Sequence, residues 1–139
     1  MNAKKILLAY DGSEPADKAY TFALDLAGHY DAKLLVLAVA RPPEPAEDVE
    51  TEAILERAEE YYKKRFEAMR RQAQAQGLTP DFRVLVGHPA EQIINAAEKE
   101  GIDHIVLGHR GKTFFERWRL GSVSKQVMHY AHCAVTVVR

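Results

Sequence analysis

Residues 6–39 decide the fold class, and they read ILLAYDGSEPADKAYTFALDLAGHYDAKLLVLAV. Two short apolar runs, Ile6 to Tyr10 and Leu34 to Val39, flank a segment whose apolar residues recur at helical spacing. Ser13 stands where the N-cap of that helix is expected. This order of strand, helix and strand predicts two parallel strands joined by a crossover helix. The helix face expected to be buried comprises Ala16, Ala19, Tyr20, Ala23, Leu26, Ala27 and Tyr30.

The same alternation continues to the end of the chain. Three more apolar runs predict strands, at Phe82 to Val86, His104 to Leu107 and Ala134 to Val138. Helical spacing predicts three further helices, one over about 51–76, one opened by Pro89 and one opened by Ser122. We therefore expect one domain over residues 1–139, of the α/β class. Its core is expected to be a doubly wound, Rossmann-like parallel sheet of five strands in the order 3-2-1-4-5, with four helices.

Composition narrows the function classes. The formal net charge is -1, which argues against binding to nucleic acid or to an anionic membrane surface. Cys133 is the only cysteine, so no intrachain disulfide can form, and a reducing compartment is expected. The first apolar run is too short for a signal peptide or a membrane span. These features predict a cytoplasmic protein.

A glycine-punctuated loop follows the fourth predicted strand. It reads Gly108-His109-Arg110-Gly111, and Gly121-Ser122 follows after nine further residues, at the start of the last helix. Glycines allow backbone amides to approach an anion, and a helix N-terminus adds free amides and a favourable dipole. Four basic residues against one acidic residue give residues 110–120 a formal charge of +3. The loop therefore predicts a phosphate site, and the alternative is an ordinary solvated turn.

Two better-known nucleotide motifs do not fit this chain. A Walker A loop requires a glycine five positions before the Gly111-Lys112 pair, where this chain has Val106. A dinucleotide fingerprint requires three glycines after the first strand, where this chain has Asp11-Gly12-Ser13. Asp11 follows the first strand, which is expected to neighbour the fourth, so its carboxylate is a candidate partner for a ribose hydroxyl. The alternative for Asp11 is a simple Asp-Gly turn.

Taken together, Asp11, Val39, Gly87-His88-Pro89 and the three-glycine loop with Ser122 resemble the ATP-binding branch of the universal stress protein family. The resemblance extends over essentially the whole chain. It implies adenine and ribose contacts from Ala9, Asp11, Val39 and Leu107, and phosphate contacts from Gly108, Arg110, Gly111, Gly121, Ser122 and Val123. Ala9 departs from relatives that carry proline there. His109, Lys112 and Ser124 lie within or beside the loop and complete the candidate set.

The expected ligand is thus ATP, with Mg²⁺ shared by its phosphates. The six histidines show no metal-ligand spacing, so no protein-held metal is predicted. The loop offers only Glu116 as a carboxylate for phosphoryl transfer, so no catalytic residue is assigned and at most slow ATP hydrolysis is expected. The function predicted is that of a stress-linked regulatory protein that binds ATP. The alternatives are a slow ATPase or nucleotide-handling enzyme of the same superfamily, and a structural dimer without nucleotide.

The last predicted strand, Ala134 to Val138, lies at the edge of a sheet ordered 3-2-1-4-5. It contains no proline, lysine or internal charge that would prevent another strand from pairing with it. We expect it to pair with its own copy in a homodimer, as the family resemblance also implies. The alternative is that the connection over 41–48, which holds three prolines, covers this edge.

Overall fold

Five parallel strands form one sheet in the order β3-β2-β1-β4-β5, as predicted. The computed structural model describes residues 3–43, 48–109 and 121–139. The strands are β1 (Lys5–Ala9), β2 (Lys33–Ala40), β3 (Asp81–Val86), β4 (His104–Gly108) and β5 (Ala134–Val138). β1, β2 and β4 are buried along most of their length, whereas the edge strands β3 and β5 are half-exposed. The long apolar runs therefore belong to strands covered on both faces.

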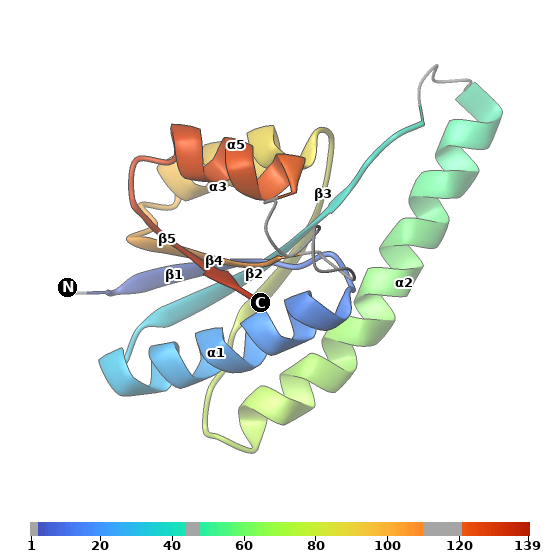
Figure 1. Cartoon of the computed structure of the whole chain (residues 1–139). Coiled ribbons are helices and arrows are strands. Elements are labelled where there is room, and N and C mark those ends of the chain that lie inside the picture. Colours follow the sequence, from blue (N-terminus) through green and yellow to red (C-terminus); the bar gives the residue numbers. More distant parts are fainter. Residues whose placement is uncertain (1–2, 44–47, 110–120) are drawn as a thin grey trace.

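Four helices cover the sheet in the described part of the chain. They are α1 (Glu14–Tyr30), α2 (Asp48–Gln74), α3 (Pro89–Lys99) and α5 (Ser122–Tyr130). Figure 1 shows α1 and α2 on one face of the sheet and α3 and α5 on the other. Two apolar clusters fill the space between the sheet and its helices, one under α1 and α2 and one under α3 and α5. The predicted doubly wound α/β architecture is confirmed.

Helix α1 begins as its sequence predicts. The Ser13 Oγ accepts a hydrogen bond of 3.2 Å from the amide of Ala16, which makes Ser13 the N-cap. The buried face differs in detail from the prediction: Leu24 is fully buried, whereas Tyr30 is 45% exposed. Leu24 continues the stripe of Tyr20 one helical turn later, and Tyr30 is the last residue of the helix, where the covering elements end.

Helix α2 is buried in its C-terminal half only. Phe66, Met69 and Ala73 lie in the core, and the Tyr20 hydroxyl donates a hydrogen bond of 2.5 Å to the Met69 carbonyl. Burial raises the pKa of Tyr20 to about 12, so the hydroxyl keeps its proton. The helical spacing that predicts this helix also places Leu55 and Ala58 on its apolar stripe, and both are only half-buried. Figure 1 shows this N-terminal half of α2 extending past the end of the sheet.

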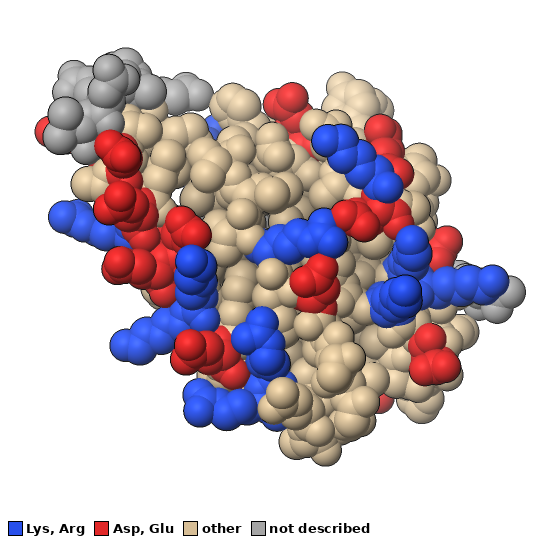
Figure 2. All heavy atoms as spheres, turned by 180° about the vertical axis from the view of Figure 1, so that it is seen from behind, with Lys and Arg blue, Asp and Glu red and all other residues tan. Residues whose placement is uncertain are grey.

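The surface carries charges of both signs. On the face seen in Figure 2, basic and acidic side chains are interspersed, with acidic ones gathered near the N-terminal end of α2. Among the residues that the structure describes, no helix combines the length and apolar character needed to cross a membrane. Part of the proline-containing connection over 41–48, considered above as a cover for β5, lies outside the described residues.

Candidate functional site

The candidate site lies where the carboxyl ends of β1 and β4 meet. Ala9 at the end of β1 is in register with Leu37 on β2 and with Leu107 on β4. β1 lies between β2 and β4 in the sheet: β2 and β3 follow on one side of β1, and β4 and β5 follow on the other. The strand order therefore reverses at β1. Ligands of doubly wound sheets bind beyond such a reversal. The predicted adjacency of the first and fourth strands is confirmed.

The apolar candidates lie on one side of the sheet. Ala9, Val39 and Val123 are partly buried against the cluster that underlies α3 and α5, and Leu107 is a buried member of it. These four residues come from β1, β2, β4 and α5, which are far apart in the sequence. The fold brings them to a common face of the sheet.

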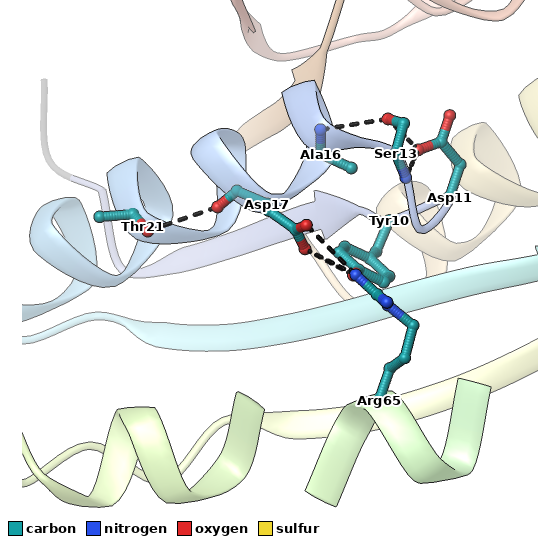
Figure 3. Close-up of polar contacts among 7 residues, drawn as sticks. All are labelled: Tyr10, Asp11, Ser13, Ala16, Asp17, Thr21 and Arg65. Carbon is teal, nitrogen blue, oxygen red and sulfur yellow. Dashed lines mark hydrogen bonds and ion pairs between the residues drawn. The ribbon is translucent and has the colours of Figure 1, made fainter. Parts of the chain in front are cut away.

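Asp11 lies in the turn between β1 and α1. Its Oδ1 accepts hydrogen bonds from the amide of Ser13 at 3.0 Å and from the Ser13 hydroxyl. Ser13 in turn caps α1, so the carboxylate is tied to the first turn of that helix, as Figure 3 shows. Asp11 is exposed. The Asp-Gly turn that the sequence left as an alternative is therefore present, and it holds the carboxylate at the edge of the sheet.

Gly108 ends β4, and a packing contact accounts for its missing side chain. A Cβ at this position would lie 2.7 Å from the amide nitrogen of Ala16 and equally close to the Pro15 carbonyl oxygen. The sequence pattern predicts that this glycine allows the backbone to approach an anion. In the structure, the close packing of the α1 backbone against this position already requires a glycine.

Gly121 is different. Within the described residues, no atom outside its immediate chain neighbours lies within 4 Å of where its Cβ would stand, and its φ of -61° suits any residue. Packing in the described structure gives no reason for glycine here. An empty space beside a helix N-terminus is what an anion-binding site needs.

Gly121 is the N-cap of α5, and it supplies no side-chain hydrogen bond to the helix. The first turn of α5 contains no acidic residue, whereas the first turn of α1 contains Glu14 and Asp17 and is capped by Ser13. The positive end of α5 therefore has no compensating carboxylate in its own first turn. Ser122 is exposed there, and Ser124 is buried.

His109 is buried rather than solvated, with 3% of its surface exposed. Its amide donates a hydrogen bond of 2.7 Å to the Val138 carbonyl, which extends the pairing of β4 with β5. A phosphate contact from this amide would compete with that bond. Arg110, Gly111 and Lys112 lie outside the described residues, and their roles stay predictions.

Sequence reasoning missed two residues beside the site. Tyr61 on α2 packs against Gly12, and Arg65 on α2 bonds to Tyr10 and Asp17. Their spacing of four residues places them on one face of α2, but this spacing alone does not indicate that the face meets the turn. The apolar stripe of the helix gave no indication of the contact, because that stripe runs through Tyr62 and Phe66.

The fold and the site define a class: a doubly wound α/β domain with a candidate anion site at the N-terminus of its last helix. In the described ranges, no group of three or more His, Cys, Asp or Glu residues is arranged to hold a metal ion.

Comparison with known proteins identifies the family. The sequence model of the Universal stress protein family matches residues 2–139. A universal stress protein from Thermus aquaticus is 40% identical over 138 residues, which cover 98% of this chain and 98% of that protein. The chain belongs to the universal stress protein family.

Solved structures of universal stress proteins are similar to this chain. The universal stress protein UspA from Lactobacillus plantarum is 27% identical, covers 100% of this chain and 99% of its own, and superposes with a TM-score of 0.83. A universal stress protein in complex with cAMP is 26% identical, covers 100% of this chain and 98% of its own, and has a TM-score of 0.68.

Proposed function

We propose that this chain binds ATP and acts as a regulatory protein of the stress response. The observation that carries the proposal is the N-terminus of α5. It begins beside the strand reversal with Gly121 as its N-cap and has no acidic residue in its first turn. No atom of the described residues, apart from the chain neighbours of Gly121, lies within 4 Å of the Cβ position of that glycine. A helix end with these features stabilises a phosphate group.

The adenosine part of the ligand has its own partners. Ala9, Val39 and Leu107 supply an apolar surface for the base, and Asp11 supplies a carboxylate for a ribose hydroxyl. The universal stress protein in complex with cAMP supports an adenine nucleotide as the ligand class. The choice of ATP rests on the formal charge of +3 over residues 110–120, which suits a triphosphate better than a monophosphate.

Magnesium would reach the site on the ATP phosphates, because the described residues offer no carboxylate cluster for it. The loop over 110–120 contains only Glu116 as a carboxylate, which favours a binding protein over an enzyme, since phosphoryl transfer needs a held metal and a positioned nucleophile. At most slow hydrolysis is expected. A chain with one cysteine suits a reducing compartment such as the cytoplasm.

A homodimer through β5 is part of the proposal. The Val138 carbonyl accepts a hydrogen bond from the amide of His109, the residue after β4, so the backbone groups of Val138 face β4. The backbone groups of successive residues alternate between the two sides of a strand. The amides of Val135 and Val137 therefore point to the open edge. A second β5 in antiparallel orientation would satisfy them and cover half-exposed valines.

Two measurements test the nucleotide proposal. Nucleotide extracted from freshly purified protein should contain ATP, and calorimetry should show tighter binding of Mg²⁺-ATP than of AMP or cAMP. Tighter binding of cAMP would keep the adenine site and reject the triphosphate. Protein that carries no nucleotide and binds none of the three ligands would support the structural dimer instead. Single-turnover assays with bound ATP would reveal any hydrolysis.

A further inference from the structure

A polar network joins α2 to both sides of the turn that holds Asp11. The Tyr10 hydroxyl donates a hydrogen bond of 2.6 Å to the Asp17 Oδ1 and accepts one of 2.7 Å from the Arg65 Nε. The terminal nitrogen NH2 of Arg65 lies 3.3 Å and 3.2 Å from the two Asp17 oxygens. Figure 3 shows Arg65 reaching from α2 to the pair. Tyr10 precedes the turn and Asp17 follows it, so Arg65 connects its two ends.

The Tyr10 hydroxyl and the Arg65 guanidinium both keep their protons near neutral pH. Burial, followed by the hydrogen bond to Asp17, raises the pKa of Tyr10, so its hydroxyl stays a donor. The hydrogen bond to Tyr10 raises the pKa of the Arg65 guanidinium. The side chains of Arg65 and Asp17 are 36% and 51% exposed, so their ion pair adds little to global stability. What the network determines is where α2 lies relative to the turn.

A second contact reaches the middle of the turn. Gly12 has a φ of +81°, and a Cβ there would lie 2.6 Å from the Tyr61 hydroxyl oxygen. The Arg65 guanidinium carbon lies 5.6 Å from the centre of the Tyr61 ring, within the range of a cation–π contact. Tyr61 and Arg65 are therefore in contact with each other and with the turn. Gly12 is the residue between Asp11 and Ser13, which are themselves hydrogen-bonded.

These contacts lie where α2 leaves the core. Phe66 is buried, but one turn earlier Tyr62 is only half-buried, and Tyr61 is 47% exposed. Apolar packing thus holds the helix from Phe66 onwards. N-terminal to that point, Arg65 and Tyr61 tie it to the Asp11 turn.

We propose that Arg65 and Tyr61 are positioning residues that hold the turn 10–17 for the ribose, so that nucleotide binding and docking of α2 are coupled. The inference rests on the proposed role of Asp11 as ribose partner. Coupling between two sites is reciprocal: if α2 favours the binding-competent turn, bound nucleotide must favour the docked α2.

The test compares Arg65→Met with a matched control, Lys63→Met. Lys63 lies on the same helix, and its ammonium pairs 3.0 Å from Glu59 on the outer surface. We expect Arg65→Met to weaken ATP about five- to tenfold and Lys63→Met to leave it unchanged. The loss of affinity caused by Arg65→Met should be smaller for 2′,3′-dideoxy-ATP, because that ligand lacks the ribose hydroxyls that the turn is proposed to bind. Arg65→Lys should restore only part of the affinity, since an ammonium cannot make the forked contact.

Hydrogen exchange supplies the second readout. ATP should slow amide exchange over residues 58–66 of α2 in the wild type and not in Arg65→Met. If Arg65→Met is unfolded by circular dichroism, the isosteric Asp17→Asn takes its place, because it weakens the same network without changing its shape.

The inference is overturned if the folded variant binds ATP as tightly as the wild type. It is also overturned if the variant loses as much affinity for dideoxy-ATP as for ATP and its amide hydrogen exchange rises throughout the chain. Those two results together indicate general destabilisation. Failure of the proposed function is recognised separately, because the wild type itself would then bind no adenine nucleotide.

Discussion

Gly108 and Pro15 are packed so closely that a Cβ on Gly108 would lie 2.5 Å from the carbonyl carbon of Pro15. The opposing atoms belong to the backbone, so no side-chain rotation can relieve such a clash. The end of β4 is thereby brought against the first turn of α1. The turn that holds Asp11 and the carboxyl end of β4 consequently lie close together.

Replacing Gly108 by alanine should destabilise the fold, because α1 would have to move away from β4. Overpacking of this kind costs about 1–3 kcal/mol in the free energy of unfolding, measurable by urea denaturation. Gly28→Ala is the control: Gly28 is exposed in α1, and apart from its chain neighbours and the nearby helix backbone, no atom of the described residues lies within 4 Å of its Cβ position. It should be neutral, or stabilise the helix by about 0.5–1 kcal/mol. Equal effects of the two substitutions would contradict the packing account.

Gly121→Val should abolish ATP binding and leave the fold largely intact. The branched side chain would fill the space beside the N-terminus of α5, where the proposal puts the phosphates, and the described residues show no clash for it. Calorimetry and circular dichroism measure the two properties, and Gly28→Val provides the matched control. Unchanged ATP affinity in a folded Gly121→Val protein would remove this helix end from the site. Gly111→Val carries the same expectation for a residue outside the described part of the chain.

Asp11→Asn should weaken ATP about tenfold, because a hydrogen bond to a charged group contributes about 1.5–3 kcal/mol and the amide retains part of it. The asparagine Oδ1 can still accept the bond from the Ser13 amide, so the turn should persist. Asp25→Asn, on the exposed surface of α1, is the control. If wild-type protein binds 2′,3′-dideoxy-ATP as tightly as ATP, the ribose hydroxyls are not the partners of Asp11.

Val137→Pro should shift the protein from dimer to monomer without unfolding it. Proline removes an amide that faces the open edge of the sheet, whereas the bonds that β5 makes to β4 come from Thr136 and Val138. Val137→Ala keeps the amide and should remain dimeric. Sedimentation velocity at micromolar concentration distinguishes these states. A monomeric wild type, or a folded Val137→Pro protein that is fully dimeric, would reject pairing through β5.

His104 should make the fold less stable in mild acid. The residue is 6% exposed, its Nε2 lies 2.6 Å from the Thr136 hydroxyl, and its Nδ1 has no hydrogen-bond partner in the described structure. Burial lowers the pKa of His104, so the unfolded chain takes up the proton at a higher pH than the folded protein does. Stability is therefore greatest above the unfolded pKa of about 6.5 and falls as the pH drops through it.

The measurement for His104 is the change in unfolding free energy between pH 7.5 and pH 5.5. That change should be smaller in His104→Gln than in the wild type. His29→Gln, at an exposed position on α1, should behave as the wild type does. A pH dependence that is identical in all three proteins would show that His104 binds its proton equally well when folded and unfolded.

Much of this protein was determined by local sequence. The strands follow from apolar runs and the helices from their spacing, because a side chain's burial repeats with the geometry of its own element. The N-cap at Ser13 is likewise local, since the bond it makes is to Ala16, three residues on. Strand order followed from the handedness of crossovers. Asp11 and Val39 could be named as candidates from where the first two strands end, whereas Ala9 and Leu107 were implied by the family resemblance.

Contacts between distant segments were decided by the tertiary structure alone. The sequence explained Gly108 by a ligand, but its missing side chain is required by the backbone of α1, which only the packing of β4 on α1 brings there. The link from Arg65 to Tyr10 spans 55 residues and depends on how deeply α2 packs before it leaves the core. Periodicity shows which face of a helix is buried. It does not show which polar side chains meet at the border of that face, because their meeting depends on the relative positions of two elements that no local pattern specifies.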